Sequence, residues 1–273
     1  MSGLWIAVLG TMFVWWFSTG AILWRVKTAD RKGGAAHLRS VLYGLPLLGL
    51  GVWGFSATLT DESAAGAALA ALSALAVWAW IELSFLSGVI TGPNDRKLPE
   101  GVPEWERFIR AWATIAYHEM LLAAALCLMA VAAWDAPNAF GLWTYVVLFF
   151  ARISAKLNLF LGVPRIHTEF LPRPLAHLPS HFRIRTLNWL FPISVTALSF
   201  AAACWLERLY AVETHGEVFG FALLATLTSL ALLEHWLMIL PVPDERLWRW
   251  MMPSAEPTRD LRKTRLSEDP NGL

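Results

Sequence analysis

Ionisable and amide side chains recur within stretches of the chain that are otherwise apolar. Such groups are costly in a lipid-spanning helix, so they usually face the interior of a bundle, where they pair with one another or serve a function. The set comprises three carboxylates, two imidazoles, two cations and one amide. We take them as the candidate site and name them the polar layer: Glu82, His118, Glu119, Arg152, Lys156, Asn158, Glu234 and His235.

Five members of the polar layer have the side-chain types of a metal site. Carboxylates and imidazoles on facing helices hold dinuclear iron or manganese in helical bundles. Those proteins place Glu and His at positions i and i+3 on one helix face, whereas the Glu and His pairs here are adjacent and point about 100° apart. The residue types therefore favour a metal site, and the spacing argues against it. The five candidate ligands are Glu82, His118, Glu119, Glu234 and His235.

Two other interpretations use the same residues. The carboxylates could neutralise Arg152 and Lys156 in a buried salt-bridge network, with the histidines as neutral hydrogen-bond partners. Alternatively, the layer could bind a pigment. An imidazole would then ligate the metal of a tetrapyrrole, or the two cations, which lie one helical turn apart, would hold the carboxylate of a pigment precursor. All three interpretations remain open at this point.

The connection Gly162–Thr186 carries three further candidate metal ligands. His177 and His181 have the i, i+4 spacing that places two imidazoles on one side of a helix, an arrangement that suits a metal. Pro179 lies between them and argues against a regular helix. Together with His167, these histidines could complete the site if the connection folds over the polar layer.

The segments that must position these residues are long and apolar. Hydrophobic residues make up 56% of the chain, charged residues only 16%, and the mean hydropathy is +0.49. A bilayer-spanning helix needs about 20 apolar residues. The sequence therefore predicts an all-α, polytopic membrane bundle with seven spans: Leu4–Trp24, Leu38–Leu59, Ala64–Ile90, Phe108–Trp134, Phe140–Leu161, Leu187–Leu209 and Val218–Leu240.

Most of the basic residues fall in alternate connections between the predicted spans. Because Lys and Arg stay on the cytoplasmic side, this alternation predicts an outer N-terminus and a cytoplasmic C-terminus. The polar layer would then lie roughly 6 to 15 Å below the cytoplasmic surface. We expect one transmembrane bundle over residues 1–252, followed by a polar, disordered cytoplasmic tail over residues 253–273.

Other site classes have no matching pattern in the sequence. There is no glycine-rich phosphate loop, no GxSxG elbow and no HExxH motif. Membrane topology accounts for the basic connections, so we expect the lipid bilayer as a partner and no nucleic acid. Cys127 and Cys204 form no CxxC motif, and sulfur chemistry is not expected.

Several phrases of the sequence are typical of one family, and they contain most of the polar layer. They are Glu82–Pro93 (ELSFLSGVITGP), Tyr117–Glu119 (YHE), Ala151–Pro164 (ARISAKLNLFLGVP), Glu169–Pro172 (EFLP), Leu190–Val195 (LFPISV) and Leu233–Trp236 (LEHW). With these phrases in this order, the chain resembles the photosynthetic complex assembly protein 2 family, the PuhE type, of phototrophic bacteria. The resemblance covers nearly the whole chain.

This resemblance implies a protein that helps to build the photosynthetic reaction centre and core antenna, by binding bacteriochlorophyll or influencing its supply. Its partners would be reaction-centre and core-antenna subunits or other assembly factors, in the bacterial inner (cytoplasmic or intracytoplasmic) membrane. No catalytic residue comes with the resemblance, so a non-enzymatic assembly factor is the leading hypothesis. The alternative is a membrane metalloenzyme of the di-iron oxygenase or desaturase type, which would use iron held by the polar layer to act on a pigment or lipid.

Overall fold

The computed structural model describes residues 2–242. This part of the chain consists of helices and their connections, without any strand. The predicted tail, residues 253–273, lies outside the described residues. The α-helices are α1 Ser2–Lys32, α2 Ala36–Tyr43, α3 Leu45–Thr58, α4 Ala64–Leu86, α5 Glu104–Ala113, α6 Ala116–Ala132, α7 Phe140–Leu161, α8 Leu190–Ala211 and α9 His215–Leu237.

Six segments of the described chain are long and apolar enough to cross a membrane. In this count, α2 and α3 together form one segment. The bent pair α5–α6 would be a seventh segment if the two helices count as one span. The all-helical fold agrees with the prediction, the six to seven candidate spans are compatible with the predicted seven, and α7 has the predicted bounds. The orientation of the bundle in the membrane stays a prediction.

The predicted fourth span, Phe108–Trp134, is wrong at its start. The first helix ends at Ala113 and the next begins at Ala116, with a bend of 66° between them. His118 and Glu119 therefore lie in the first turn of α6 rather than several turns inside a span. They are closer to the end of the bundle than the sequence indicated.

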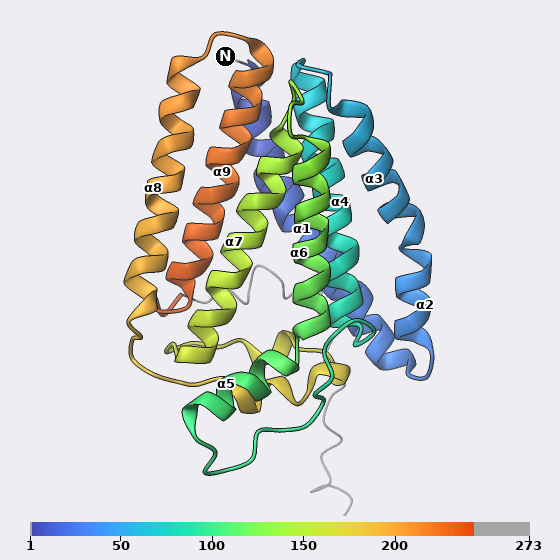
Figure 1. Cartoon of the computed structure of the whole chain (residues 1–273), viewed down its shortest axis with the longest axis vertical. Coiled ribbons are helices and arrows are strands. Elements are labelled where there is room, and N and C mark those ends of the chain that lie inside the picture. The colour runs from blue at the N-terminus through green and yellow to red at the C-terminus, as the bar shows by residue number, and fades with distance from the viewer. Residues whose placement is uncertain (1, 243–273) are drawn as a thin grey trace, which may run out of the picture.

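Helix α5 is amphipathic and lies across one end of the bundle (Figure 1). Trp105, Phe108, Ile109 and Trp112 are exposed on it, whereas Arg107 is buried. Aromatic residues exposed on a short amphipathic helix are typical of the membrane interface. The sequence prediction assigned part of α5 to a span because it counted the apolar residues and did not consider that they lie on one face of the helix.

A turn between Thr91 and Asn94 packs into the break that separates α5 from α6. The Thr91 carbonyl accepts a hydrogen bond from the backbone N–H of His118 (2.9 Å), and the N–H of Asn94 donates to the carbonyl of Ala113 (3.1 Å). Backbone groups released by a break need such partners in a membrane protein. Gly92 lies so close that an added Cβ would be 2.1 Å from the Ala113 oxygen.

We therefore expect Gly92→Ala to destabilise the protein by about 1–3 kcal/mol, because the new methyl group meets backbone atoms that cannot rotate away. Gly49→Ala is the matched control, since nothing lies within 4 Å of a Cβ added at Gly49 in α3. Thermal unfolding of both purified variants in one detergent measures the effect. A Gly92→Ala variant that melts with the wild type would contradict the close packing at the break.

Helix α4, which carries Glu82, occupies the interior of the bundle and packs against α3, α7 and α9. Its small side chains Ala67, Ala70, Ala71 and Ala74 are buried, and residues of this size let neighbouring helices approach closely in membranes. In Figure 1, α2 and α3 lie at one edge of the bundle and α8 lies at the opposite edge. The interior position of α4 is what places Glu82 away from the lipid.

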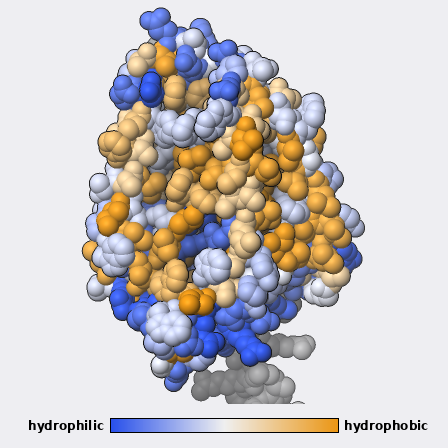
Figure 2. All heavy atoms as spheres, in the orientation of Figure 1, coloured by the Kyte–Doolittle hydropathy of each residue, from blue (hydrophilic) through white to orange (hydrophobic). Residues whose placement is uncertain are grey.

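Hydrophobic side chains cover the middle of the molecule, and hydrophilic side chains gather toward its two ends (Figure 2). We name the end that carries α5 and the connection from residue 162 to residue 186 the loop end (Figure 1). A hydrophobic belt between two hydrophilic ends is the surface expected of a helical bundle that crosses a bilayer. The described chain thus has the features of a multi-pass membrane protein.

Candidate functional site

The polar layer occupies the loop-end parts of four helices. Glu82 lies one turn from the end of α4, and His118 and Glu119 lie in the first turn of α6. The remaining members belong to the last turns of α7 and α9. The structure thus brings the members of the layer to one end of the bundle, where they divide into two ion pairs and two hydrogen-bonded groups.

The first ion pair joins Glu82 of α4 to Arg152 of α7. Arg152 Nη2 donates to Glu82 Oε2 at 2.9 Å, and the Glu82 side chain is only 9% exposed. His118 Nε2 lies 3.6 Å from Glu82 Oε1, a separation longer than a hydrogen bond. Glu82 Oε1 and Arg152 Nε have no hydrogen-bond partner among the described residues. Arg152 thus balances the buried charge of Glu82, and one acceptor and one donor of the pair remain without a hydrogen bond.

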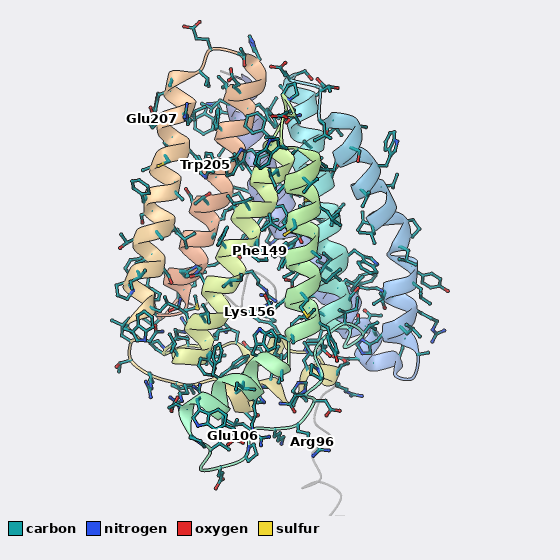
Figure 3. The ribbon with its side chains drawn as sticks, in the orientation of Figure 1. Arg96, Glu106, Phe149, Lys156, Trp205 and Glu207 are labelled. Atoms are coloured by element: carbon teal, nitrogen blue, oxygen red, sulfur yellow. The ribbon has the colours of Figure 1, made fainter. Side chains whose placement is uncertain are left out.

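The second ion pair joins Lys156 of α7 to Glu119 of α6. The lysine ammonium also lies 5.3 Å from the centre of the Phe85 ring, and that ring stacks on His118 with centres 4.4 Å apart. Figure 2 shows a hollow with a hydrophilic floor in the hydrophobic belt, at the place where Figure 3 labels Lys156. The second pair thus lies at an indentation of the membrane-facing surface.

His235 and Asn158 belong to a hydrogen-bonded group between α7, α8 and α9. His235 Nδ1 donates to the Ala231 carbonyl, and its Nε2 lies at the same distance, 2.8 Å, from Ser154 Oγ, from which it accepts in the neutral ring. Asn158 donates to Ser194 Oγ at 3.0 Å. Both ring nitrogens of His235 are therefore occupied, and this group connects helices rather than presenting ligands.

Glu234 forms the fourth group with a residue that the sequence did not single out. Trp15 Nε1 donates to Glu234 Oε1 at 2.9 Å and so links α1 to α9. Glu234 and His235 have different neighbours because adjacent positions of a helix point in different directions. Within residues 2–242, no three His, Cys, Asp or Glu side chains are grouped so that they could hold a metal ion. The geometry gives the predicted di-iron arrangement no support.

The connection between α7 and α8 folds over the loop end of the bundle (Figure 1). Lys27 Nζ of α1 donates to the carbonyls of Glu169 (2.8 Å) and Leu171 (3.0 Å), and Leu175 packs against Phe85 below the polar layer. The fold-back that the sequence left open is therefore present. Three 3-10 helices order the connection: Thr168–Phe170, Arg173–Leu175 and Leu178–His181.

The histidines of this connection do not complete a metal site in the described chain. His167 Nδ1 lies 3.2 Å from the Glu169 carboxylate, and His181 Nε2 donates to the Arg96 carbonyl at 3.2 Å. His177 and His181 are both buried. These contacts are with the connection itself and with the segment before α5, so the histidines order the loop end.

The buried loop histidines predict a dependence on pH. Burial lowers the pKa of His177 and of His181, and the neighbouring Arg107 and Arg110 lower that of His181 further. In the unfolded connection both pKa values return to about 6.5. The folded connection is therefore fully stable above about pH 6.5. It loses stability as the pH falls from about 6.5 toward the lowered pKa values of the folded state, because the histidines of the unfolded connection bind protons first.

Hydrogen–deuterium exchange of residues 162–186 tests this pH dependence. After correction for the intrinsic exchange rate, protection should be lower at pH 5.5 than at pH 7.5. The variant His177→Gln with His181→Gln should lose most of the difference, while the span α4 serves as an internal reference. Equal protection of the connection at both pH values would show that the two imidazoles do not control its packing.

A cavity of about 520 Å³ lies between α1, α4, α7 and α9. Its walls include Ile6–Leu23 of α1 and Ala68–Leu86 of α4, a length of about 25 Å at 1.5 Å per residue. The charged residues of its lining are Glu82, Arg152 and Glu234, all in the loop-end half. Sequence patterns contain no signal for this cavity, because it depends on how helices distant in the chain pack together.

The fold and these groups define a multi-pass helical membrane protein with a buried ion-pair layer. Its sequence matches one family model over residues 1–259, and the chain belongs to that family, described as "Protein of unknown function (DUF3623)". A relative from Rhodobacter capsulatus, named "Uncharacterized 30.4 kDa protein in puhA 5'region", is 57% identical over 256 residues, which cover 94% of this chain and 93% of the relative. No solved structure matches the chain.

Proposed function

We propose that this chain is an integral membrane assembly factor for the bacterial photosynthetic reaction centre and core antenna. It would lie in the bacterial inner membrane, with an outer N-terminus and its loop end toward the cytoplasm. The observation that carries the proposal is the name of the Rhodobacter capsulatus relative, which places that protein in the 5' region of puhA. The resemblance of the sequence to the PuhE type of assembly protein supports the same function.

The surface of the bundle supports a role in binding other membrane subunits. The Glu119–Lys156 pair lies in a hollow of the hydrophobic belt, where a charged pair in contact with lipid is unfavourable. A transmembrane helix of a partner subunit would cover this hollow and pair its own polar groups with the two charges. The connections between the spans are short, and they leave little room for a soluble catalytic domain.

The described residues do not fit a tetrapyrrole held inside the bundle. His118 is completely buried beneath Phe85, and both ring nitrogens of His235 already have partners. No histidine of the described chain lines the cavity between α1, α4, α7 and α9. We therefore propose that the chain influences bacteriochlorophyll supply through the subunits or assembly factors that it binds.

Site-specific photo-crosslinking tests the proposed contact with subunits. A photoreactive amino acid in place of Tyr117, which is 54% exposed next to His118 in α6, should label a reaction-centre or core-antenna subunit in membranes. The same amino acid in place of Tyr210, which is 89% exposed near the other end of α8, is the matched control and should not. Labelling of unrelated proteins from both positions would contradict the proposal.

A further inference from the structure

We propose that the loop end carries a binding site for anionic phospholipid, formed by α5 and residues 183–189. We name this surface the interfacial site. The phosphate of the lipid lies beside Arg183 and Arg185, and its acyl chains lie against the exposed apolar side chains next to them. The interfacial site does not include the Glu119–Lys156 pair, and the proposal does not depend on the assembly function.

The first apolar part of the interfacial site is one face of α5. Four apolar side chains at helical spacing are exposed there: Trp105, Phe108, Ile109 and Trp112. The buried Arg107 holds the opposite face against the bundle, because its guanidinium group donates to the carbonyls of Phe160 and His181. Helix α5 is therefore fixed with its apolar face outward, as in helices that lie in a membrane interface.

The second apolar part is the segment that follows the buried His181. Ile184 is 80% exposed, although the backbone on both sides of it is held: the Val163 N–H donates to the Arg183 carbonyl, and the Arg185 N–H donates to the Val163 carbonyl, both at 3.2 Å. Trp189 is 68% exposed, and tryptophan prefers the membrane interface. An ion pair between Arg183 and Glu104 joins this segment to the start of α5.

The charge of this region selects an anionic lipid. Helix α5 and the connection from residue 162 to residue 186 together contain six arginines, three glutamates and neither lysine nor aspartate. One of the glutamates, Glu104, lies within electrostatic reach of three guanidinium groups, those of Arg107, Arg183 and Arg185. Arg185 is exposed and forms no ion pair within residues 2–242. Basic residues at a membrane surface attract anionic lipids, and the planar guanidinium group matches the geometry of phosphate.

The interfacial site lies where the hydrophobic belt ends. Helix α5 crosses the end of the bundle at which hydrophilic side chains gather (Figure 1, Figure 2). The phosphates of a bilayer lie at such a border, just outside the hydrocarbon layer. A zwitterionic head group would bring an ammonium group next to the arginines. Phosphatidylcholine should therefore bind more weakly than phosphatidylglycerol.

Native mass spectrometry of the purified full-length chain, titrated separately with dioleoylphosphatidylglycerol and dioleoylphosphatidylcholine, tests this selectivity. The wild type should bind phosphatidylglycerol at least about tenfold more tightly, and Arg183→Gln with Arg185→Gln should lose most of that preference. Arg31→Gln with Arg39→Gln removes the same charge from two exposed arginines of α1 and α2 and should keep it. Equal binding of the two lipids by the wild type, or an equal loss of preference in both double variants, would overturn the proposal.

Hydrogen–deuterium exchange of the wild type in nanodiscs shows where the lipid binds, and it decides the matter if Arg183→Gln with Arg185→Gln does not fold. Residues 104–113 and 183–189 should exchange at least about threefold more slowly in phosphatidylglycerol than in phosphatidylcholine. Helix α2 belongs to the opposite edge of the bundle and serves as the reference that should not change. Equal exchange of the interfacial site in both lipids, or slower exchange only after a partner subunit is added, would assign this surface to a protein and overturn the proposal.

Discussion

Replacing Arg152 with glutamine is expected to destabilise the protein by about 2–4 kcal/mol, because the variant leaves the buried Glu82 carboxylate without its counter-charge, although the Arg152 side chain is itself 36% exposed. Arg152 supplies the hydrogen bond at 2.9 Å to a carboxylate that is 9% exposed, whereas His118 Nε2 lies 3.6 Å from the other carboxylate oxygen and makes no hydrogen bond to it. Thermal unfolding in detergent and the amount of protein in membranes should both report a large loss.

Two controls separate this effect from the general loss of a positive charge. Glu82→Gln combined with Arg152→Gln removes both charges and should recover most of the lost stability. Arg39→Gln alters an exposed arginine of α2 and should change stability by no more than about 0.5 kcal/mol. If Arg152→Gln were as stable as Arg39→Gln, the buried ion pair would not be a stabilising element of the polar layer.

Asn188→Ala is expected to cost about 3–4 kcal/mol, since each buried group that loses its partner costs about 1–3 kcal/mol. The Asn188 side chain donates to Asn158 Oδ1 (3.0 Å) and to the Gly162 carbonyl (2.8 Å). Its oxygen accepts from the backbone N–H groups of Leu190 (2.9 Å) and Phe191 (3.0 Å), at the start of α8. One amide thus joins the ends of α7 and α8.

Thr226→Ala is a suitable comparison for Asn188→Ala. Within residues 2–242, the one hydrogen bond of the Thr226 hydroxyl goes to the Ala222 carbonyl in the preceding turn of α9, so its loss should cost about 1 kcal/mol or less. Both variants can be compared by denaturation in the same mixed micelles. Similar stability of the two variants would mean that the amide of Asn188 does not hold the two helix ends together.

The apolar spans could be predicted from the sequence because each is about as long as a bilayer is thick. The polar layer could also be found, since its charges interrupt those spans. The break between α5 and α6 was missed, although Glu104, Glu106, Arg107 and Arg110 recur among the aromatic residues at helical spacing. That periodicity, rather than mean hydropathy, distinguishes an interfacial helix from the start of a span.

The partners within the layer could not be predicted from the sequence. The pairing of Glu82 with Arg152 depends on the rotation of α4 and α7 about their axes, which composition does not specify. Trp15 is 219 residues from Glu234, and Asn188 is 30 residues from Asn158. The cavity exists only once α1 packs against α9. Tertiary packing, rather than local spacing, therefore decides which polar groups meet.

The quantity of assembled reaction centre with its core antenna, in a phototrophic strain that lacks this chain, tests the proposed assembly function most directly. Membrane absorbance of the pigmented complexes, compared with the same strain carrying the wild-type gene on a plasmid, gives that quantity. We predict a severalfold loss of the assembled complexes in the deletion strain and recovery on complementation. Unchanged levels of reaction centre and core antenna in the deletion strain would contradict a role in their assembly.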